Sequence, residues 1–294
     1  MDINFEYYKI FYYVAKYKNI TKAAGVLKSN QPNVTRVIKL LESQLNCTLF
    51  IREPRGLKLT EEGRRLYEHV EVACQHLFNA EAELSSLGEE LGGTIEIGVT
   101  ETALHLYLMD KICEFKKSYP EIKIKIRNNT TPEVIGDLNG GKTDIAFITN
   151  PFSVSEKLTS RKMTEFHEIL VGGSTYAELA ERRKTLKELC SYPLIGLGNG
   201  TATYELYKAV FSEAKIDYEL DMEVATANLM LPLIQNDLGI GFVPEVLAEP
   251  LLEKKELVQI DVDMKMPPRD IQMVWDKGVG KSWAAELFIK YLEK

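Results

Sequence analysis

The chain of 294 residues is long enough for two or three domains, and its 45% hydrophobic and 27% charged residues are typical of a soluble globular protein. No apolar run approaches the ~18 residues of a membrane-spanning helix, and the charged N-terminal stretch lacks a signal-peptide cleavage site. The four scattered cysteines form no C-x-x-C pair, which argues against a zinc site or a disulfide framework. We therefore expect a cytoplasmic protein.

The net charge of −7 is distributed unevenly along the chain. Residues 1–60 hold ten Lys and Arg against four acidic residues, whereas residues 61–91 hold eight Glu against two Arg. A basic first domain on an acidic protein suggests that this end meets a polyanion. A solvated basic face would explain the charge alone equally well.

Apolar residues at helical spacing predict three helices in the first sixty residues. The first helix carries Phe5, Tyr8, Tyr12 and Ala15 on one face, and the third carries Val34, Ile38, Leu41 and Leu45. Thr21 is the expected N-cap of a short second helix, and Pro32 fits only in the first turn of the third. Two helices joined by a short polar turn predict a helix-turn-helix unit, whose second helix can enter the major groove of DNA.

The start of the third helix and the segment after it supply candidate DNA contacts. Polar side chains at the N-terminal end of a recognition helix reach base edges, while Lys and Arg neutralise phosphates. The segment FIREPRGLKLTEEG, residues 50–63, predicts a β-hairpin wing with a basic tip. The candidate DNA-binding residues are Gln31, Asn33, Thr35, Arg36 and Lys39 on the helix, with Arg52, Arg55 and Lys58 on the wing.

The string TKAAGVLKSNQPNVTRVIKLLESQLNCTLFIREPRGLKLTEEG, residues 21–63, resembles the signature of LysR-type transcriptional regulators. It contains the paired alanines, Q-P, a hydroxyl–Arg pair, L-E, L-F-x-R, a basic wing and L-T-x-x-G. Thr35 replaces the usual Ser, Asn46 replaces the Gly that ends the recognition helix, and Gly25 lies inside a short helix. Asn tolerates the left-handed conformation of a helix end, whereas Gly25 weakens its helix by up to ~1 kcal/mol. The resemblance implies an all-α winged helix-turn-helix domain at 1–60 that binds promoter DNA.

A heptad pattern follows the wing. Its apolar positions alternate at spacings of four and three and are flanked by glutamates: Leu66, Val70, Ala73, Leu77, Ala80, Leu84, Leu87 and Leu91. This predicts a coiled-coil dimerisation helix at about 61–91, whereas a helix packed on its own domain would give a wider stripe. The string GEELGG, residues 88–93, ends the pattern and predicts a hinge.

After the hinge, predicted strands and helices alternate, which indicates an α/β domain with a mainly parallel sheet. The string GDLNGGKT, residues 136–143, matches the P-loop pattern, but it lies where a helix ends and a strand begins. Phosphate binding needs the reverse order, so we expect Gly140 and Gly141 to cap a helix C-terminus beside Lys142. The string LIGLGNGTATYEL, residues 194–206, has the order strand, loop, helix, but lacks both a dinucleotide fingerprint and a P-loop lysine. A helix N-terminus here could bind a small anion, although an ordinary capped turn explains each residue as well.

The C-terminal two-thirds also resemble the effector domain of LysR-type regulators, which is similar to periplasmic binding proteins. The resemblance implies an effector-binding domain at 94–294, with subdomain I at about 94–165 and 270–294 and subdomain II at about 166–269. It places a small-molecule effector in the cleft between them, beside Thr100, Glu101, Thr102, Asn129, Thr149, Thr201 and Thr226. Hydroxyl groups and helix N-termini suit a small anion or polar metabolite, whereas Glu101 favours a cationic or zwitterionic ligand.

Support for catalysis is weak. His105 could lie one helical turn after Glu101, an arrangement that permits acid–base chemistry, but no nucleophile elbow, metal cluster or cofactor motif accompanies it. His69 and His76 lie on the linker. We therefore predict a LysR-type regulator without enzymatic activity, cofactor or metal, which dimerises through the linker helix and assembles into a homotetramer. The alternative is a small-molecule-binding or enzymatic α/β domain whose N-terminal helices mediate protein contacts.

Overall fold

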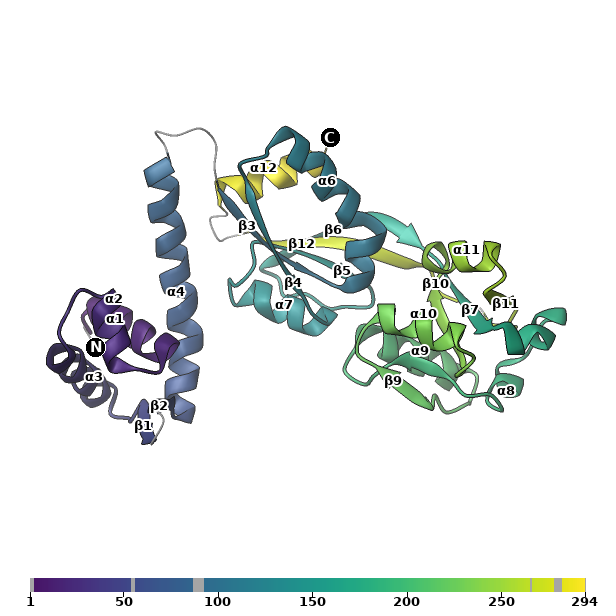
Figure 1. Cartoon of the computed structure of the whole chain (residues 1–294), viewed down its shortest axis with the longest axis horizontal. Helices are drawn as coiled ribbons and strands as arrows, with labels where there is room; N and C mark the ends of the chain where they lie inside the picture. The colour runs from purple at the N-terminus through teal and green to yellow at the C-terminus, as the bar shows by residue number, and fades with distance from the viewer. Residues whose placement is uncertain (1–2, 54–55, 87–92, 265, 278–281, 294) are drawn as a thin grey trace. The chain divides into compact units, whose positions relative to one another are not determined.

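The computed structural model describes residues 3–53, 56–86, 93–264, 266–277 and 282–293, excluding the side chains at 52–53, 75–76, 79 and 82–86. The chain divides into two compact units, Met1–Gly88 and Glu89–Lys294, each of which is described by itself (Figure 1). Across the described ranges, no helix combines the length and apolar character needed to cross a bilayer.

The first unit consists of helices and one small hairpin. Its elements are α1 (Phe5–Tyr17), α2 (Ile20–Val26), α3 (Gln31–Leu45), β1 (Phe50–Glu53), β2 (Gly56–Leu59) and α4 (Glu61–Ser86). The predicted cap at Thr21 is wrong, because α2 begins at Ile20 and is capped by Asn19, two residues before Thr21; the Asn19 side chain accepts from Lys22 N at 2.9 Å. At the C-terminal end of α3, Asn46 adopts the expected left-handed conformation, with φ of 53°.

The predicted apolar faces of α1 and α3 form the core of this unit. Val34 and Leu41 of α3 are fully buried against Phe11 of α1 and the paired alanines of α2. Helix α4 joins the same core through Val70 and Cys74, which are 7% and 2% exposed. The first members of the heptad pattern therefore pack on their own domain, because α1 offers them an apolar face within the same chain.

The later members of the heptad pattern lie on the surface of α4. Ala73 and Ala80 are exposed, and Leu77 keeps 47% of its surface accessible. The Leu84 side chain and residues Leu87 and Leu91 lie outside the described residues, as does most of the predicted hinge. Only the part of the predicted dimer seam from Ala73 to Ala80 is therefore an exposed apolar stripe in the described region.

Several signature residues have structural roles around the wing. Glu42 Oε1 accepts from Leu49 N at 2.8 Å, and Thr60 Oγ1 donates to Thr48 O at 2.7 Å. A Cβ on Gly63 would lie 2.2 Å from the Leu49 carbonyl oxygen, so only glycine permits the close approach of α4 to this turn. Glu42, Thr60 and Gly63 thus hold the segment that places the wing beside α3.

The second unit begins with an α/β lobe, which we call lobe I. Its five-stranded sheet has the order β4–β3–β5–β12–β6. The strands are β3 (Thr94–Val99), β4 (Lys123–Asn128), β5 (Ile145–Thr149), β6 (Leu158–Phe166) and β12 (Arg269–Asp276). Strand β3 is parallel to β4 and β5, whereas β12 is antiparallel to both β5 and β6.

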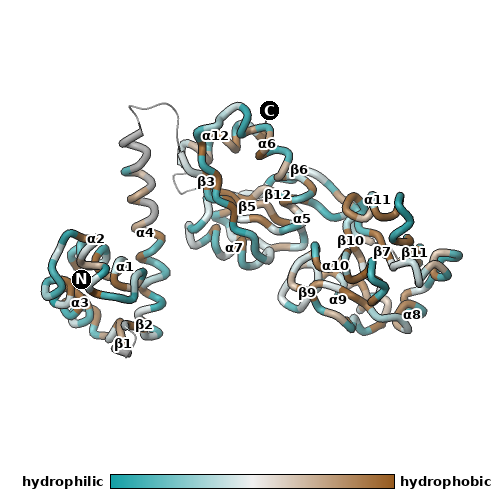
Figure 2. Tube along the Cα trace, in the orientation of Figure 1, coloured by the Kyte–Doolittle hydropathy of each residue, from teal (hydrophilic) through white to brown (hydrophobic). Residues whose placement is uncertain are grey.

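Helices cover both faces of the lobe I sheet. They are α5 (Glu101–Ala103), the π-helical turn η1 (Leu104–Leu108), α6 (Met109–Ser118), α7 (Thr131–Asn139) and α12 (Trp283–Leu292). Alternate residues of β5 face opposite sides: Phe147 packs with α6 and α12, whereas Ala146 and Ile148 pack with α7. The apolar residues concentrate on the strands, as the brown segments of β3 and β5 show (Figure 2).

Lobe II is mixed rather than mainly parallel, which corrects the expectation for this part of the chain. Its three-stranded sheet has the order β10–β7–β11 with antiparallel pairing, whereas β8 and β9 pair in parallel and Leu194 forms a parallel bridge to Ile240. Its strands are β7 (Glu168–Gly173), β8 (Ile195–Leu197), β9 (Met222–Val224), β10 (Ile240–Pro244) and β11 (Leu257–Ile260). Its helices are η2 (Ser174–Glu181), α8 (Leu186–Leu189), α9 (Ala202–Glu213), α10 (Ala227–Gln235) and α11 (Glu245–Glu253).

The P-loop-like string has the role expected from its order. Helix α7 ends at Asn139 with Gly140 as its C-cap, Gly141 has φ of +66°, and β5 begins at Ile145. Lys142 N donates to Asp137 O at 2.8 Å, and the Lys142 ammonium lies 3.4 Å from the Asp137 carboxylate. The string therefore closes a helix C-terminus, where carbonyl groups rather than N–H groups would face a phosphate.

Candidate functional site

The start of α3 presents the predicted polar face to solvent. Gln31, Arg36 and Lys39 are exposed, and Asn33 and Thr35 are partly exposed. These side chains project from one helix because Val34 and Ile38 on the opposite face are buried in the core. Gln31, Thr35, Arg36 and Lys39 also line an open depression along the helix, together with Pro32 and Leu40.

Hydrogen bonds hold part of this polar face in place. The Asn30 side chain caps α3 by accepting from Asn33 N at 2.9 Å. The Asn33 amide donates to Ser29 Oγ at 3.1 Å and accepts from Arg36 Nη2 at 3.2 Å. The Thr35 hydroxyl donates to Gln31 O at 2.9 Å, so toward a partner it offers an acceptor and a methyl group. The face thus combines oriented amide and hydroxyl groups with two cations.

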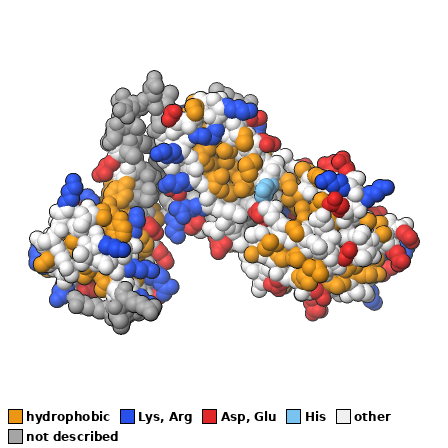
Figure 3. Space-filling model, viewed as in Figure 1, with side chains coloured by type: hydrophobic (Ala, Val, Ile, Leu, Met, Phe, Trp, Pro, Cys, Tyr) orange, Lys and Arg blue, Asp and Glu red, His pale blue; other side chains and the backbone are white. Residues whose placement is uncertain are grey.

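The predicted wing follows α3 in the sequence, and the structure describes only one of its three candidate DNA-binding side chains. Lys58 is exposed on β2, whereas the Arg52 side chain and all of Arg55 lie outside the described residues. Strands β1 and β2 pair antiparallel, with Glu53 opposite Gly56. Gly56 has φ of +133°, and a Cβ there would lie 2.8 Å from the Lys18 carbonyl oxygen. Lys and Arg side chains are spread over the visible face of this unit (Figure 3).

A cavity of about 250 Å³ lies between the two lobes of the second unit. Lobe I lines it with Thr100, Glu101, Thr102, Asn128, Asn129, Thr130, Thr131, Glu133 and Thr149, and lobe II with Leu197, Thr201, Ala202, Thr203, Ala225, Thr226 and Ala227. All seven residues predicted for the effector site are among them. The loops after separate strands bring them together, because in α/β sheets such loops meet at the carboxyl ends of the strands.

Four helix N-termini meet this cavity, those of α5, α7, α9 and α10. Free N–H groups and the positive end of the helix dipole make such ends favourable for anions. Thr201 caps α9 by accepting from Tyr204 N at 3.1 Å, and Thr130 forms a capping box with Glu133 on α7. Neither Thr100 nor Thr226 caps its helix with its side chain, and at α10 the Asn228 N–H is instead bound by the Glu101 carboxylate of lobe I.

The Thr100 hydroxyl is the clearest sign that something polar binds here. The residue is 8% exposed, and its Oγ1 is buried without a hydrogen-bond partner. Such a group costs free energy unless a ligand or water satisfies it. Since Thr100 lines the cavity, a bound molecule there can supply the missing partner.

The cavity is acidic in its side chains. Its described lining contains Glu101 and Glu133 and no Lys, Arg or His. Glu101 of lobe I is bound by Asn228 of lobe II, whose backbone N and Nδ2 donate to the two carboxylate oxygens at 3.0 and 2.6 Å. Asn228 Nδ2 also lies 3.1 Å from His105 Nε2. Glu101 and His105 therefore belong to one network that joins the lobes.

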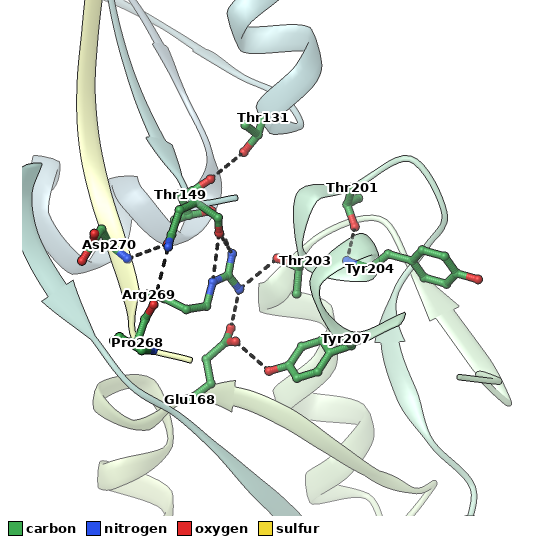
Figure 4. Close-up of polar contacts among 11 residues, drawn as sticks. Thr131, Thr149, Glu168, Thr201, Thr203, Tyr204, Tyr207, Pro268, Arg269 and Asp270 are labelled. Atoms are coloured by element: carbon green, nitrogen blue, oxygen red, sulfur yellow. Dashed lines mark hydrogen bonds and ion pairs between the residues drawn. The ribbon is translucent and has the colours of Figure 1, made fainter. Parts of the chain in front are cut away.

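Behind the cavity, a buried ion pair links both crossings between the lobes (Figure 4). Arg269 Nη1 lies 2.9 Å from Glu168 Oε1, and the two side chains are 2% and 5% exposed. Arg269 also donates to the hydroxyls of Thr203 and Thr149 at 3.1 and 3.2 Å. Tyr207 donates to Glu168 Oε2 at 2.6 Å. Burial, and then the Glu168 charge, raise the pKa of Tyr207 well above its usual value, which keeps it a donor.

Sequence reasoning missed this ion pair and the Asn228 contact. Glu168 and Arg269 are 101 residues apart, and Asn228 lies 127 residues after Glu101, so no spacing pattern connects them. The available signal was the pair of expected subdomain boundaries, at about 165–166 and 269–270, which fall close to Glu168 and Arg269. Within the described residues, no group of three or more His, Cys, Asp or Glu is placed to bind a metal ion.

Two family models match the chain over nearly its whole length. The model "LysR substrate binding domain" matches residues 88–294, and "Bacterial regulatory helix-turn-helix protein, lysR family" matches residues 5–64. The chain is 28% identical over 237 residues to the transcriptional regulator YofA of Bacillus subtilis, covering 81% of this chain and 80% of that protein. It is 25% identical over 233 residues to the regulator CysB of Burkholderia cenocepacia, covering 79% and 74%.

Solved structures show the same fold, two of them over 99% of the chain and one over the second unit's part of it. The crystal structure of CbnR, a LysR family transcriptional regulator, matches with a TM-score of 0.71 at 17% identity, covering 99% of this chain and 98% of that one. CbnR in complex with its target DNA matches with a TM-score of 0.72 at 18% identity and 99% coverage of both chains. The effector binding domain of QuiR in complex with shikimate matches with a TM-score of 0.59 at 19% identity, covering 69% and 96%.

Proposed function

The chain belongs to the LysR family of DNA-binding transcriptional regulators with a substrate-binding effector domain, and from this premise we propose which residues perform each task. Residues 1–60 bind promoter DNA, residues 61–91 link and dimerise two chains, and residues 94–294 bind the effector. The protein acts where the DNA is, which gives it a cytoplasmic location. The exposed stripe on α4 and the exposed face of α3 support this division.

Helix α3 enters the major groove with its N-terminal turns. Gln31, Asn33 and Thr35 choose bases, while Arg36 and Lys39 neutralise phosphates. Arg52, Arg55 and Lys58 of the wing extend the phosphate contacts. The observation that carries this assignment is the exposed polar face of α3, with its amide and hydroxyl groups already oriented by hydrogen bonds. The structural relative CbnR, solved with its target DNA, supports it by fold.

The effector binds in the cavity between the lobes. Its anionic or polar group satisfies the buried Thr100 hydroxyl and the free N–H groups of α5, with Thr102, Asn129, Thr149, Thr201 and Thr226 around it. Glu101 forms the remaining contact. Binding favours one arrangement of the lobes over another, and that preference changes how the dimers of a tetramer lie on a promoter. The carrying observation is the unpartnered hydroxyl inside a cavity lined by both lobes.

The cleft binds and does not catalyse. Asn228 engages both Glu101 and His105, so that pair serves to join the lobes rather than to move a substrate proton. The ion pair of Arg269 and Glu168 supports Thr149 and Thr203 from behind and is not open to the cavity lining. This assigns the charged residues near the cleft to positioning and binding.

Fluorescence anisotropy with the DNA upstream of the protein's own gene, across a salt series, tests the proposal, with random DNA of equal length as control. We expect specific binding that weakens steeply with salt, since phosphate contacts release counterions. Equal and weak binding to both DNAs at low salt would reject the assignment of α3. Addition of candidate effectors to the same assay then tests whether the cleft controls DNA binding.

A further inference from the structure

The carboxylate of Glu101 occupies the N-terminal end of α10. Its Oε2 accepts from Asn228 N at 3.0 Å and its Oε1 from Asn228 Nδ2 at 2.6 Å. A helix N-terminus is a favourable place for an anion, so Glu101 stands where the negative group of a ligand would otherwise bind. The two hydrogen bonds fix this charge at one point of the cavity wall.

The other helix ends leave one place for an anionic group. On α7, Glu133 Oε2 accepts from Thr130 N at 3.1 Å, which supplies that end with its own carboxylate. On α9, the Thr201 hydroxyl takes the Tyr204 N–H. The end of α5 has no side-chain cap and carries the buried, unpartnered hydroxyl of Thr100. A single negative group of a ligand is therefore best accommodated beside Thr100.

A second negative group on the ligand would meet repulsion. The cavity measures about 250 Å³, so such a group would lie close to Glu101 or Glu133, and the described lining offers no cationic side chain to balance it. A cationic group is favoured instead. Each Glu101 oxygen accepts one hydrogen bond from Asn228 and keeps a further lone pair for an ammonium donor.

Building on the effector cleft proposed above, we infer that Glu101 determines the charge class of the effector, a small zwitterion of the α-amino acid type. Its carboxylate binds at the end of α5 beside Thr100, and its ammonium group binds Glu101. Because Glu101 is fixed by Asn228 of lobe II, the ammonium group contacts a residue that already joins the lobes. The same side chain, Glu101, thereby binds the charged group of the ligand and forms the contact between the lobes.

Calorimetric titration of the full chain tests this with the L-amino acids, each paired with the carboxylic acid that lacks the amino group, and with succinate as a dicarboxylate. We expect at least one amino acid to bind about tenfold or more tightly than its des-amino partner, a ratio equivalent to ~1.4 kcal/mol. In Glu101→Gln this ratio falls to about one, and succinate binding improves. Gln keeps an acceptor for Asn228, and a thermal melt verifies that the variant is folded.

Glu205→Gln is the matched control, because Glu205 is an exposed acid in the first turn of α9 that does not line the cavity. Its ratio should equal that of the natural chain. A des-amino acid or succinate that binds the natural chain as tightly as any amino acid would overturn the inference, as would a ratio unchanged by Glu101→Gln. Sulfate and phosphate are titrated as simple anions, and their binding without amino acid binding would reject the ligand class but keep the cleft. Lack of binding by all these probes would reject the inferred ligand class, and the DNA-binding assay with other candidate effectors would then test the cleft.

Discussion

The outer face of α3 and the cavity between the lobes are both built from short amide and hydroxyl side chains near helix N-termini, but their charges are opposite. Arg36 and Lys39 accompany the polar groups of α3, whereas the described cavity lining has Glu101 and Glu133 and no cation. A helix face with full positive charges suits a polyanion, which presents many phosphates at once. A cavity whose positive character comes only from helix ends suits one small anionic group. Amide and hydroxyl side chains near helix N-termini are therefore suited to two different ligands, according to the charges that accompany them.

The largest expected effect is a loss of stability in the second unit, which contains the cavity, without a matching loss in the first unit, which contains α3. Arg269→Met leaves Glu168 buried without its charge partner, which should lower the free energy of unfolding of the second unit by about 3–5 kcal/mol. Both tryptophans, Trp275 and Trp283, lie in that unit, so urea unfolding followed by tryptophan fluorescence reports it selectively.

The matched control for this prediction is Arg161→Ala. Arg161 pairs with Glu293 at 3.0 Å, but both side chains are nearly half exposed, so the loss should be about 0–1 kcal/mol. Similar losses in the two variants would show that the buried pair contributes no more than a surface pair.

Within the first unit, two glycines should respond in opposite directions. Gly63→Ala places a Cβ 2.2 Å from the Leu49 carbonyl oxygen and should destabilise the unit by about 1–3 kcal/mol, with a corresponding loss of DNA binding. Gly25→Ala meets nothing within 4 Å and should stabilise α2 by up to ~1 kcal/mol. Thermal melts followed by circular dichroism measure both, and a neutral Gly63→Ala would argue against the close approach of α4 to the wing.

Arg36→Ala tests whether the exposed face of α3 binds the phosphates of operator DNA. Loss of one phosphate contact should weaken operator binding by about tenfold and lower the slope of log affinity against log salt by about one. Sedimentation should show an unchanged oligomeric state, because Arg36 is exposed on α3 and makes its described contact within that helix, to Asn33. If operator affinity remains the same, α3 does not dock through this face.

Substitutions of two threonines in the cavity lining distinguish a capping residue from a ligand-binding residue. Thr201→Val removes the cap of α9 and should cost about 1 kcal/mol of stability. Thr100→Val removes a buried hydroxyl that has no partner, so stability should stay level or rise, while effector binding weakens. Calorimetry measures effector binding by both variants, and thermal melts measure their stability. A Thr100→Val protein that binds effector normally would place the ligand elsewhere.

Prediction from the sequence succeeded where structure follows local order. The candidate DNA-binding residues lie within one helix and the hairpin after it, so periodicity and the position of Pro32 were enough to predict these elements and the exposed polar face of α3. The P-loop-like string was resolved in the same way, because the order of helix and strand around Gly140 is a local property. The cap at Thr21 failed because Asn19 is an equally good local candidate, and only the backbone path selects it.

The heptad pattern shows where local order stops being enough. Leu66 and Val70 fit a coiled-coil seam as well as Leu77 does, yet Val70 is buried against α1 and Leu77 is exposed. Periodicity specifies which residues share a helix face but not what covers that face. The covering surface belongs to a different part of the chain, so the packing of α1 on α4 decides it.

The sequence by itself determined the family, the α/β character of the second unit and the helix proposed to read DNA, because these depend on residue type and short-range spacing. Only the tertiary structure decided the antiparallel sheet of lobe II, the burial of Arg269 with Glu168 and the capture of Glu101 by Asn228. The two side-chain contacts join residues 101 and 127 positions apart, and their strength comes from burial and exact alignment of donors with acceptors. Such alignment exists only once the two lobes have folded against each other.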